Sequence, residues 1–121
     1  MRIRIKIGDI TLYAKLNKTK TAKKVWEMLP FRSKFNTWGD EIYFSIPVDE
    51  ELDETAKEEV EIGDLGYWPE GKAFCIFFGP TPISKEGKII PASAVNIIGK
   101  IEGDPTCLRN VEEDEIILER A

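Results

Sequence analysis

The segment that decides the fold reads Phe35-Asn36-Thr37-Trp38-Gly39-Asp40-Glu41-Ile42-Tyr43-Phe44-Ser45. Gly39-Asp40 favours a turn, because glycine readily adopts left-handed backbone conformations and aspartate hydrogen-bonds to its own backbone. The residues after the turn alternate and predict a strand over Glu41–Ile46, with Phe44 facing the core. Tyr43 and Ser45 then lie on the opposite face, which makes them candidates for a binding site.

Strand patterns also dominate the rest of the chain. Residues 2–7 and 10–16 alternate between apolar and polar, and Gly8-Asp9 between them predicts a β-hairpin. A helix is expected from Asn17 or Thr19 to Leu29, because Pro30 stops it. We expect further extended segments at 31–35, 73–78, 93–102 and 115–120, a turn-rich segment at 63–71, and a short helix at 106–111.

These elements predict one domain over residues 1–121 and a mainly β fold, because strands do not alternate with crossover helices. We expect a closed barrel of about eight strands, capped by one or two short helices. The preferred core positions are Ile42, Phe44 and Ile46 on one strand and Phe74, Ile76 and Phe78 on another. On a third strand, one face is expected to carry Val95, Ile97 and Ile101.

The composition excludes several classes of chemistry. The chain has no histidine, which removes Ser-His and Cys-His nucleophile pairs and histidine metal sites. Cys75 and Cys107 are too few for a disulfide framework, so we expect two reduced thiols. We expect a cytoplasmic protein, because no apolar run resembles a signal peptide or spans a bilayer. We also expect neither a metal nor an organic cofactor. Abundant Lys, Glu and Ile together with the absence of Gln resemble thermophile composition.

Charge is unevenly distributed along the chain. Residues 1–34 hold ten Lys or Arg and two Asp or Glu, whereas residues 35–121 hold seven and twenty. The net charge of −5 argues against nucleic acid as a general partner. A basic hairpin face keeps that alternative open, with Arg2, Arg4, Lys6, Tyr13 and Lys15. Residues 49–61 hold eight acidic residues and are expected to form a solvated segment.

Several motifs resemble the cyclophilin fold. Asn96-Ile97-Ile98-Gly99-Lys100-Ile101-Glu102-Gly103 is similar to the cyclophilin run (Val/Phe)-Gly-Lys-Val-x-Glu-Gly, and 35–39 is similar to Phe-Met-x-Gln-Gly. The whole chain resembles a small prokaryotic, TM1367-type cyclophilin-like family through its segments at 36–39, 42–45, 62–69 and 91–96. The resemblance implies a cyclophilin-like barrel. It does not assign a reaction, because the role of that family is not established.

The resemblance also suggests where isomerase chemistry would lie. Cyclophilins hold a proline ring in an apolar pocket and use an arginine near the prolyl nitrogen. Here Phe35 matches the pocket phenylalanine, Trp38 replaces the expected glutamine, and Arg32 is the candidate catalytic arginine. Arg32 lies an odd number of residues from Phe35, so an unbroken strand puts the two on opposite faces. A divergent peptidyl-prolyl isomerase is therefore the alternative.

The preferred hypothesis is a module that binds a peptide or small-molecule ligand in an aromatic groove. Asp40, Glu41 and Asp64 are the nearest carboxylates, and one could act as an acid or base if burial raised its pKa. Self-association through an exposed sheet edge remains open. The candidate ligand-binding residues are Phe35, Asn36, Trp38, Tyr43, Ser45, Tyr67, Trp68, Phe74, Ser93 and Asn96.

Overall fold

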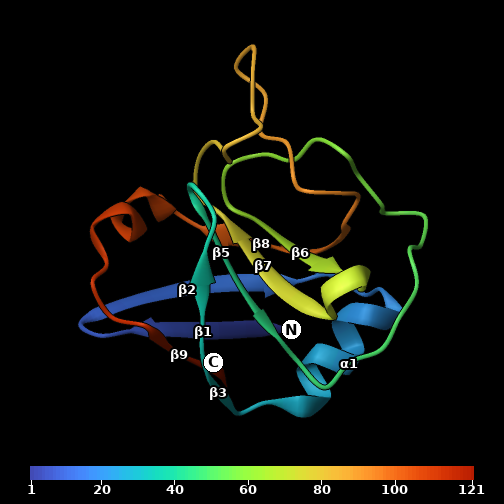
Figure 1. Ribbon diagram of the computed structural model, residues 1–121. Helices are drawn as coiled ribbons and strands as arrows, with labels where there is room; N and C mark the ends of the chain where they lie inside the picture. The colour runs from blue at the N-terminus through green and yellow to red at the C-terminus, as the bar shows by residue number, and fades with distance from the viewer.

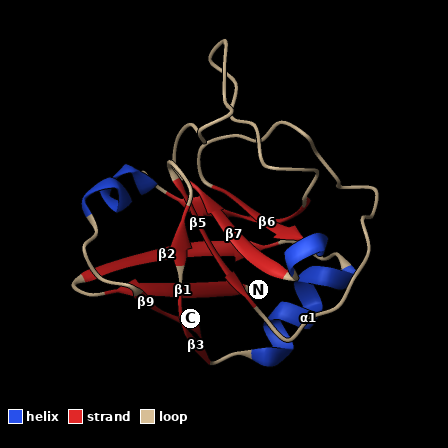
Figure 2. Ribbon diagram, viewed as in Figure 1, coloured by secondary structure: helices blue, strands red, loops and turns tan.

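The computed structural model describes all 121 residues and has the predicted mainly β fold (Figures 1 and 2). It contains nine strands, one more than the approximate number expected, together with one α-helix and two short 3₁₀ helices. In chain order the elements are β1 (Arg2–Ile7), β2 (Ile10–Leu16), α1 (Lys20–Met28), β3 (Phe31–Lys34), β4 (Asn36–Thr37), β5 (Glu41–Ser45), β6 (Asp64–Trp68), η1 (Pro69–Gly71), β7 (Ala73–Phe77), β8 (Asn96–Glu102), η2 (Pro105–Asn110) and β9 (Glu115–Arg120).

A single sheet curls into a nearly closed barrel. Its strand order is β3-β9-β1-β2-β8-β6-β7-β5-β4, and every neighbouring pair is antiparallel. The two end strands, β3 and β4, are separated in the chain only by Phe35, so the two ends of the sheet lie close together. The Phe35 amide donates to the carbonyl of Asp114 at 2.8 Å and continues the pairing past the end of β3.

The interior of the barrel holds the main core. The alternating side chains Ile3, Ile5 and Ile7 of β1 point inward and are at most 1% exposed, as their period of two predicts. The Thr19 side chain accepts from the Ala22 amide and caps α1, which packs its buried face against this core. The core residues predicted at 42–46 and 74–78 all belong to it, namely Ile42 and Phe44 of β5, Phe74 and Ile76 of β7, and Ile46 and Phe78 directly after these strands.

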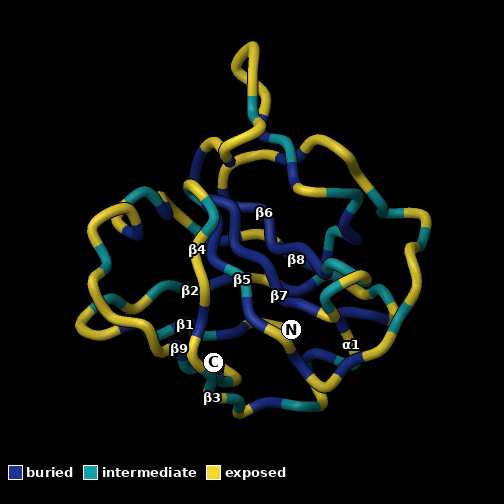
Figure 3. Tube along the Cα trace, viewed as in Figure 1, coloured by how far each residue is buried: buried dark blue, intermediate teal, exposed yellow.

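A smaller apolar cluster lies on the outer face of the sheet. It combines Ala73, Cys75 and Phe77 of β7 with side chains of the long connections, Val60, Ile89 and Val95. Every residue of β7 is therefore buried, some inside the barrel and some beneath these connections (Figure 3). Burial on both faces explains why residues 73–78 form an unbroken apolar run in the sequence.

The segment at 63–71 corrects one prediction, because residues 64–68 form β6 in the middle of the sheet. Its glycine at position 66 does not make a turn. A Cβ there would lie 3.0 Å from Cγ2 of Val95, so the glycine allows the outer connection to pack closely on the strand.

A second correction concerns β8. Val95 and Ile97 lie with the outer cluster, whereas Ile101 lies in the interior with Ile98. The adjacent residues Leu65 and Gly66 of β6 pair with Gly99 and Ile97 of β8, which are two residues apart. This bulge reverses which side chains of β8 point inward and which point outward. A strict period of two cannot anticipate this change.

The acidic residues 49–61 form no regular strand or helix, as the charge run predicts. None of the helices has both the length and the hydropathy needed to cross a bilayer.

Candidate functional site

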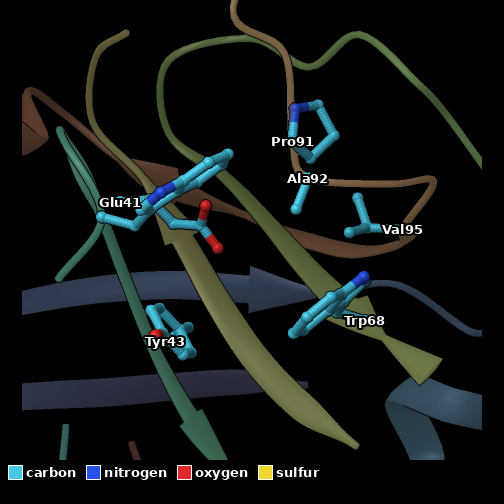
Figure 4. Close-up of a pocket in the computed structure, with 7 residues that line it drawn as sticks. Glu41, Tyr43, Trp68, Pro91, Ala92 and Val95 are labelled. Carbon is cyan, nitrogen blue, oxygen red and sulfur yellow. The ribbon is translucent and has the colours of Figure 1, made fainter. Parts of the chain in front are cut away.

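The candidate site is a pocket on the outer face of the sheet, beside the smaller apolar cluster. Its cavity volume is about 290 Å³. It is framed by the turn before β5, by the outer faces of β5 and β6, and by residues 91–95 of the long connection to β8 (Figure 4). The lining residues are Trp38, Glu41, Tyr43, Trp68, Pro91, Ala92 and Val95.

The turn between β4 and β5 positions Trp38 at the rim. The Trp38 amide donates to the carbonyl of Glu41 at 2.9 Å, and Gly39 has φ +61°, the left-handed region that favours glycine. The next amide, of Asp40, donates to the carbonyl of Pro80 at 2.9 Å. The turn is thus attached to the neighbouring loop.

Glu41 is the first residue of β5 and the only charged side chain that lines the pocket. It is only 6% exposed, and it takes part in no ion pair. Burial raises the pKa of Glu41 to about 7, and a hydrogen bond with the Cys75 thiol opposes this shift. The pKa of Cys75 is raised well above its usual value, first by burial and then by the charge of Glu41.

The other two candidate carboxylates serve the fold. Asp40 Oδ2 accepts from Arg109 Nε at 3.0 Å, which ties the β4–β5 turn to η2. Asp64 Oδ2 accepts from the Glu61 amide at 2.8 Å, and its Oδ1 accepts from Lys100 Nζ at 3.2 Å. Both therefore have partners that Glu41 lacks.

Trp68 forms the opposite wall and is held by a short polar chain. Its Nε1–H donates to Ser93 Oγ at 2.6 Å, and Ser93 Oγ donates to Glu70 Oε2 at 3.1 Å. A Cβ on Gly71 would lie 2.7 Å from the indole ring, so that glycine leaves room for the ring in this position. The wall is therefore fixed before any ligand arrives.

Of the predicted site residues, the structure brings Trp38, Tyr43 and Trp68 together at the pocket, with Ser93 directly behind Trp68. Tyr67 and Phe74 instead lie fully buried in the barrel core. Tyr67 donates its hydroxyl hydrogen to the carbonyl of Val48.

Asn96 lies at the end of the barrel beneath the acidic segment. Its Oδ1 accepts from the Asp53 amide at 2.8 Å, while its Nδ2 donates to the carbonyl of Glu51 at 2.8 Å. It is completely buried, so its hydrogen-bonding groups hold this segment and are not turned toward the pocket.

The remaining predicted residues lie outside the pocket. Ser45 is exposed and donates to the carbonyl of Gly71 at 3.3 Å. Phe35 and Asn36 border a separate, wider depression of about 620 Å³ between the β4–β5 turn and η2. Arg32 is exposed on β3, with Nε 3.7 Å from Glu115 Oε1, whereas Phe35 is buried. The two side chains thus lie on opposite faces, as their odd spacing indicates.

Four lining residues are absent from the predicted ligand-binding set, namely Glu41, Pro91, Ala92 and Val95. Glu41 was predicted only as a nearby carboxylate, and Val95 only as a residue on one face of a strand. The signal for Glu41 was present, because alternation places it on the same face of β5 as Tyr43. No comparable signal exists for the 91–95 segment, because its position depends on how a long connection folds back over the sheet.

Comparison with known proteins agrees with the barrel. The family described as Cyclophilin-like matches residues 1–119. The chain is also similar to the solution structure of the hypothetical protein AF2241 from Archaeoglobus fulgidus, with 43% identity and a TM-score of 0.84 over 100% of this chain and 95% of that chain. No curated protein matches the chain. The motifs, the barrel and the near full-length match agree: the chain belongs to the cyclophilin-like family.

Proposed function

We propose that this protein is a binding module that holds a small ligand, or a single side chain of a peptide, in the pocket between β5, β6 and residues 91–95. The observation that carries the proposal is an aromatic-walled cavity lined by a buried acidic residue, Glu41, that has no cationic partner. Apolar walls with a few well-placed polar groups are typical of small-molecule sites. The proposal involves no chemical step.

The size of the cavity limits the ligand. A volume of about 290 Å³ lies at the small end of the range of ligand pockets, roughly 300 to 1,000 Å³. It suits a fragment-sized molecule or one residue better than a long peptide. The hydrogen bond that fixes Trp68 favours binding, because a wall that is already ordered loses little conformational entropy when the ligand enters.

No specific observation favours the isomerase alternative. Arg32 is exposed, pairs with Glu115 and does not line the pocket, and the Phe35 ring is buried. An arginine acting on a bound prolyl nitrogen would need to reach the same cavity as the proline ring.

The test is a fragment screen followed by amide and indole NMR shifts. The library contains cationic, neutral and anionic fragments in equal number, each at millimolar concentration. Binding in the pocket should move the indole signals of Trp38 and Trp68. It should not move that of Trp26, which lies on α1 against the guanidinium of Arg120. Absence of shifts at both pocket indoles for all three charge classes would refute the proposal.

A filled-pocket variant supplies the control. Ala92→Phe places a ring at the exposed edge of the cavity and should abolish the fragment-induced shifts. Ala94→Phe makes the same change at a half-buried residue that does not line the cavity, and should leave them intact. Fragment binding that survives Ala92→Phe would place the site elsewhere.

A further inference from the structure

The pocket has an unusual charge balance for a buried site. Glu41, a residue that is only 6% exposed, supplies the carboxylate, and no Lys or Arg lines the cavity. The Cys75 thiol, which donates to the carbonyl of Ala73, is the polar side-chain group that lowers the pKa of Glu41 against the effect of burial. A buried charge is normally paired or neutralised, because losing its hydration is costly. The ionised form of Glu41 therefore has no counter-ion among the lining residues.

The walls suit a positive group of a particular kind. Figure 4 shows the Glu41 carboxylate in the space bounded by Tyr43, Trp68 and the 91–95 segment. Aromatic rings attract cations through the negative potential of their faces, and they do so without supplying hydrogen bonds. Trp38 adds a third ring to the lining. An anion would instead meet the carboxylate and the same negative ring faces.

A metal ion does not match these walls. Metal ions in proteins take several oxygen, nitrogen or sulfur ligands, and the chain gathers no group of three or more His, Cys, Asp or Glu side chains that could hold one. One carboxylate among aromatic rings is better matched to a single, softer organic charge.

We propose that the pocket binds an organic monocation, an ammonium or guanidinium group on a short apolar stem, with Glu41 as its counter-ion and the rings of Trp38, Tyr43 and Trp68 as its walls. This proposal rests on the proposed function and specifies its ligand class. The cation can belong to a free amine or to a Lys or Arg side chain of a peptide, which share the same recognition chemistry.

Binding of a cation should depend on pH through Glu41. Two titratable groups face this carboxyl from the packed elements: Tyr43 on β5 and Cys75 on β7. The turn before β5, β6 and the 91–95 segment contribute Trp38, Trp68, Pro91, Ala92 and Val95, which carry no charge. Glu70 of η1 stands behind Ser93.

The sign of the pH effect follows from the Glu41 pKa of about 7. The ionised form of Glu41, which pairs with the cation, is about one-tenth populated at pH 6 and nine-tenths populated at pH 8. Affinity for a cation should therefore rise about tenfold between these two values. Binding at pH 7 should also release about half a proton per ligand, because the bound cation keeps Glu41 ionised.

The experiment compares three ligands of similar size and different charge. Indole-detected NMR titrations use n-butylammonium, 1-butanol and butyrate at pH 6, 7 and 8, in phosphate buffer because common amine buffers would compete. Butylammonium should bind at least tenfold more tightly than the other two at pH 8, and about tenfold more tightly at pH 8 than at pH 6. Equal or tighter binding of butanol or butyrate would overturn the cation proposal and leave the pocket proposal standing.

Two variants separate the role of Glu41 from general electrostatics. Glu41→Gln keeps the shape and should reduce butylammonium affinity at least tenfold, remove its pH dependence and leave butanol unaffected. Glu58→Gln removes one charge from an exposed residue that has no ion pair, and should change nothing. Butylammonium binding that is unchanged in Glu41→Gln would overturn the assignment of the counter-ion.

A last comparison identifies the source of the cation. N-acetyl-lysine methylamide and N-acetyl-arginine methylamide present the charge as a peptide does. Tighter binding of either than of butylammonium supports the cation proposal with a peptide side chain as its source. Weaker binding of both than of butylammonium supports the cation proposal with a free amine as the source of the cation. If no ligand of any charge moves the pocket indoles, both the cation proposal and the proposed function fail.

Discussion

The ionisation of Glu41 should make the protein lose stability as the pH rises, and Glu41→Gln should remove that loss. The pKa of this carboxyl is about 7 in the folded protein and about 4.5 when unperturbed. Because folding raises the pKa, folding favours the protonated form. Its stabilising contribution is complete below about pH 4.5 and disappears as the pH rises through 7.

The size of the effect follows from these two values. Each tenfold difference in proton affinity corresponds to about 1.4 kcal/mol, so the complete effect is at most about 3 kcal/mol. Between pH 5 and pH 8 the unfolding free energy of the wild type should fall by about 2 kcal/mol relative to that of Glu41→Gln, after allowance for solvent in the open pocket. The stability of the glutamine variant relative to the wild type should therefore be higher at pH 8 than at pH 5 by this amount.

Guanidinium chloride unfolding followed by far-ultraviolet circular dichroism measures this difference at pH 5, 6, 7 and 8, without amine buffers. Other carboxylates titrate in both proteins and cancel in the comparison. Glu58→Gln, at an exposed residue, should follow the wild type within about 0.5 kcal/mol at every pH. A gap between wild type and Glu41→Gln that stays constant from pH 5 to pH 8 would refute the argument that burial raises this pKa.

Three further substitutions, with Gly87→Ala as a control for the first, test the barrel around the pocket. Gly99→Ala would put a Cβ 2.4 Å from the carbonyl oxygen of Lys15, so it should lower the unfolding free energy by about 3 kcal/mol in the same denaturation assay. Gly87 has φ +76° but open space around it, so Gly87→Ala should lower the unfolding free energy by only about 1 kcal/mol. Asn96→Ala removes the clamp on the acidic segment and should cost about 2 kcal/mol, with faster hydrogen exchange at the Asp53 amide and unchanged pocket indole signals. Phe74→Ala empties space beside a stacked ring in the core and should lower stability by about 4 kcal/mol, whereas a loss below 1 kcal/mol would contradict its assignment to the core.

Local patterns predicted much of the barrel because strands such as β1 have one buried face. The hairpin of residues 2–16, the helix after Thr19 and the inward face of β5 follow from period and capping alone. β6 was missed because Gly66, which weakens a strand locally, is needed there for contact with Val95. That contact joins residues far apart in the chain, so no local rule reports it.

The candidate site divides in the same way. Alternation places Tyr43 outward, and the turn residues around Gly39 indicate that Trp38 lies near the start of the same strand. The sequence could not separate Trp68, which lines the pocket, from Tyr67, which is fully buried, since both are adjacent aromatics in one segment. Their opposite faces follow only once β6 is known to be a strand.

The sequence by itself determined the family, the barrel and the absence of histidine chemistry, because motif order, strand period and composition are all carried along the chain. Only the tertiary structure decided which carboxylate is buried at the pocket without a cationic partner. Asp40 and Asp64 find cationic partners from distant elements, whereas Glu41 is covered by the fold and receives none. Burial and pairing are properties of the surroundings of a side chain, and these surroundings come from β7, β6 and a connection that closes over them.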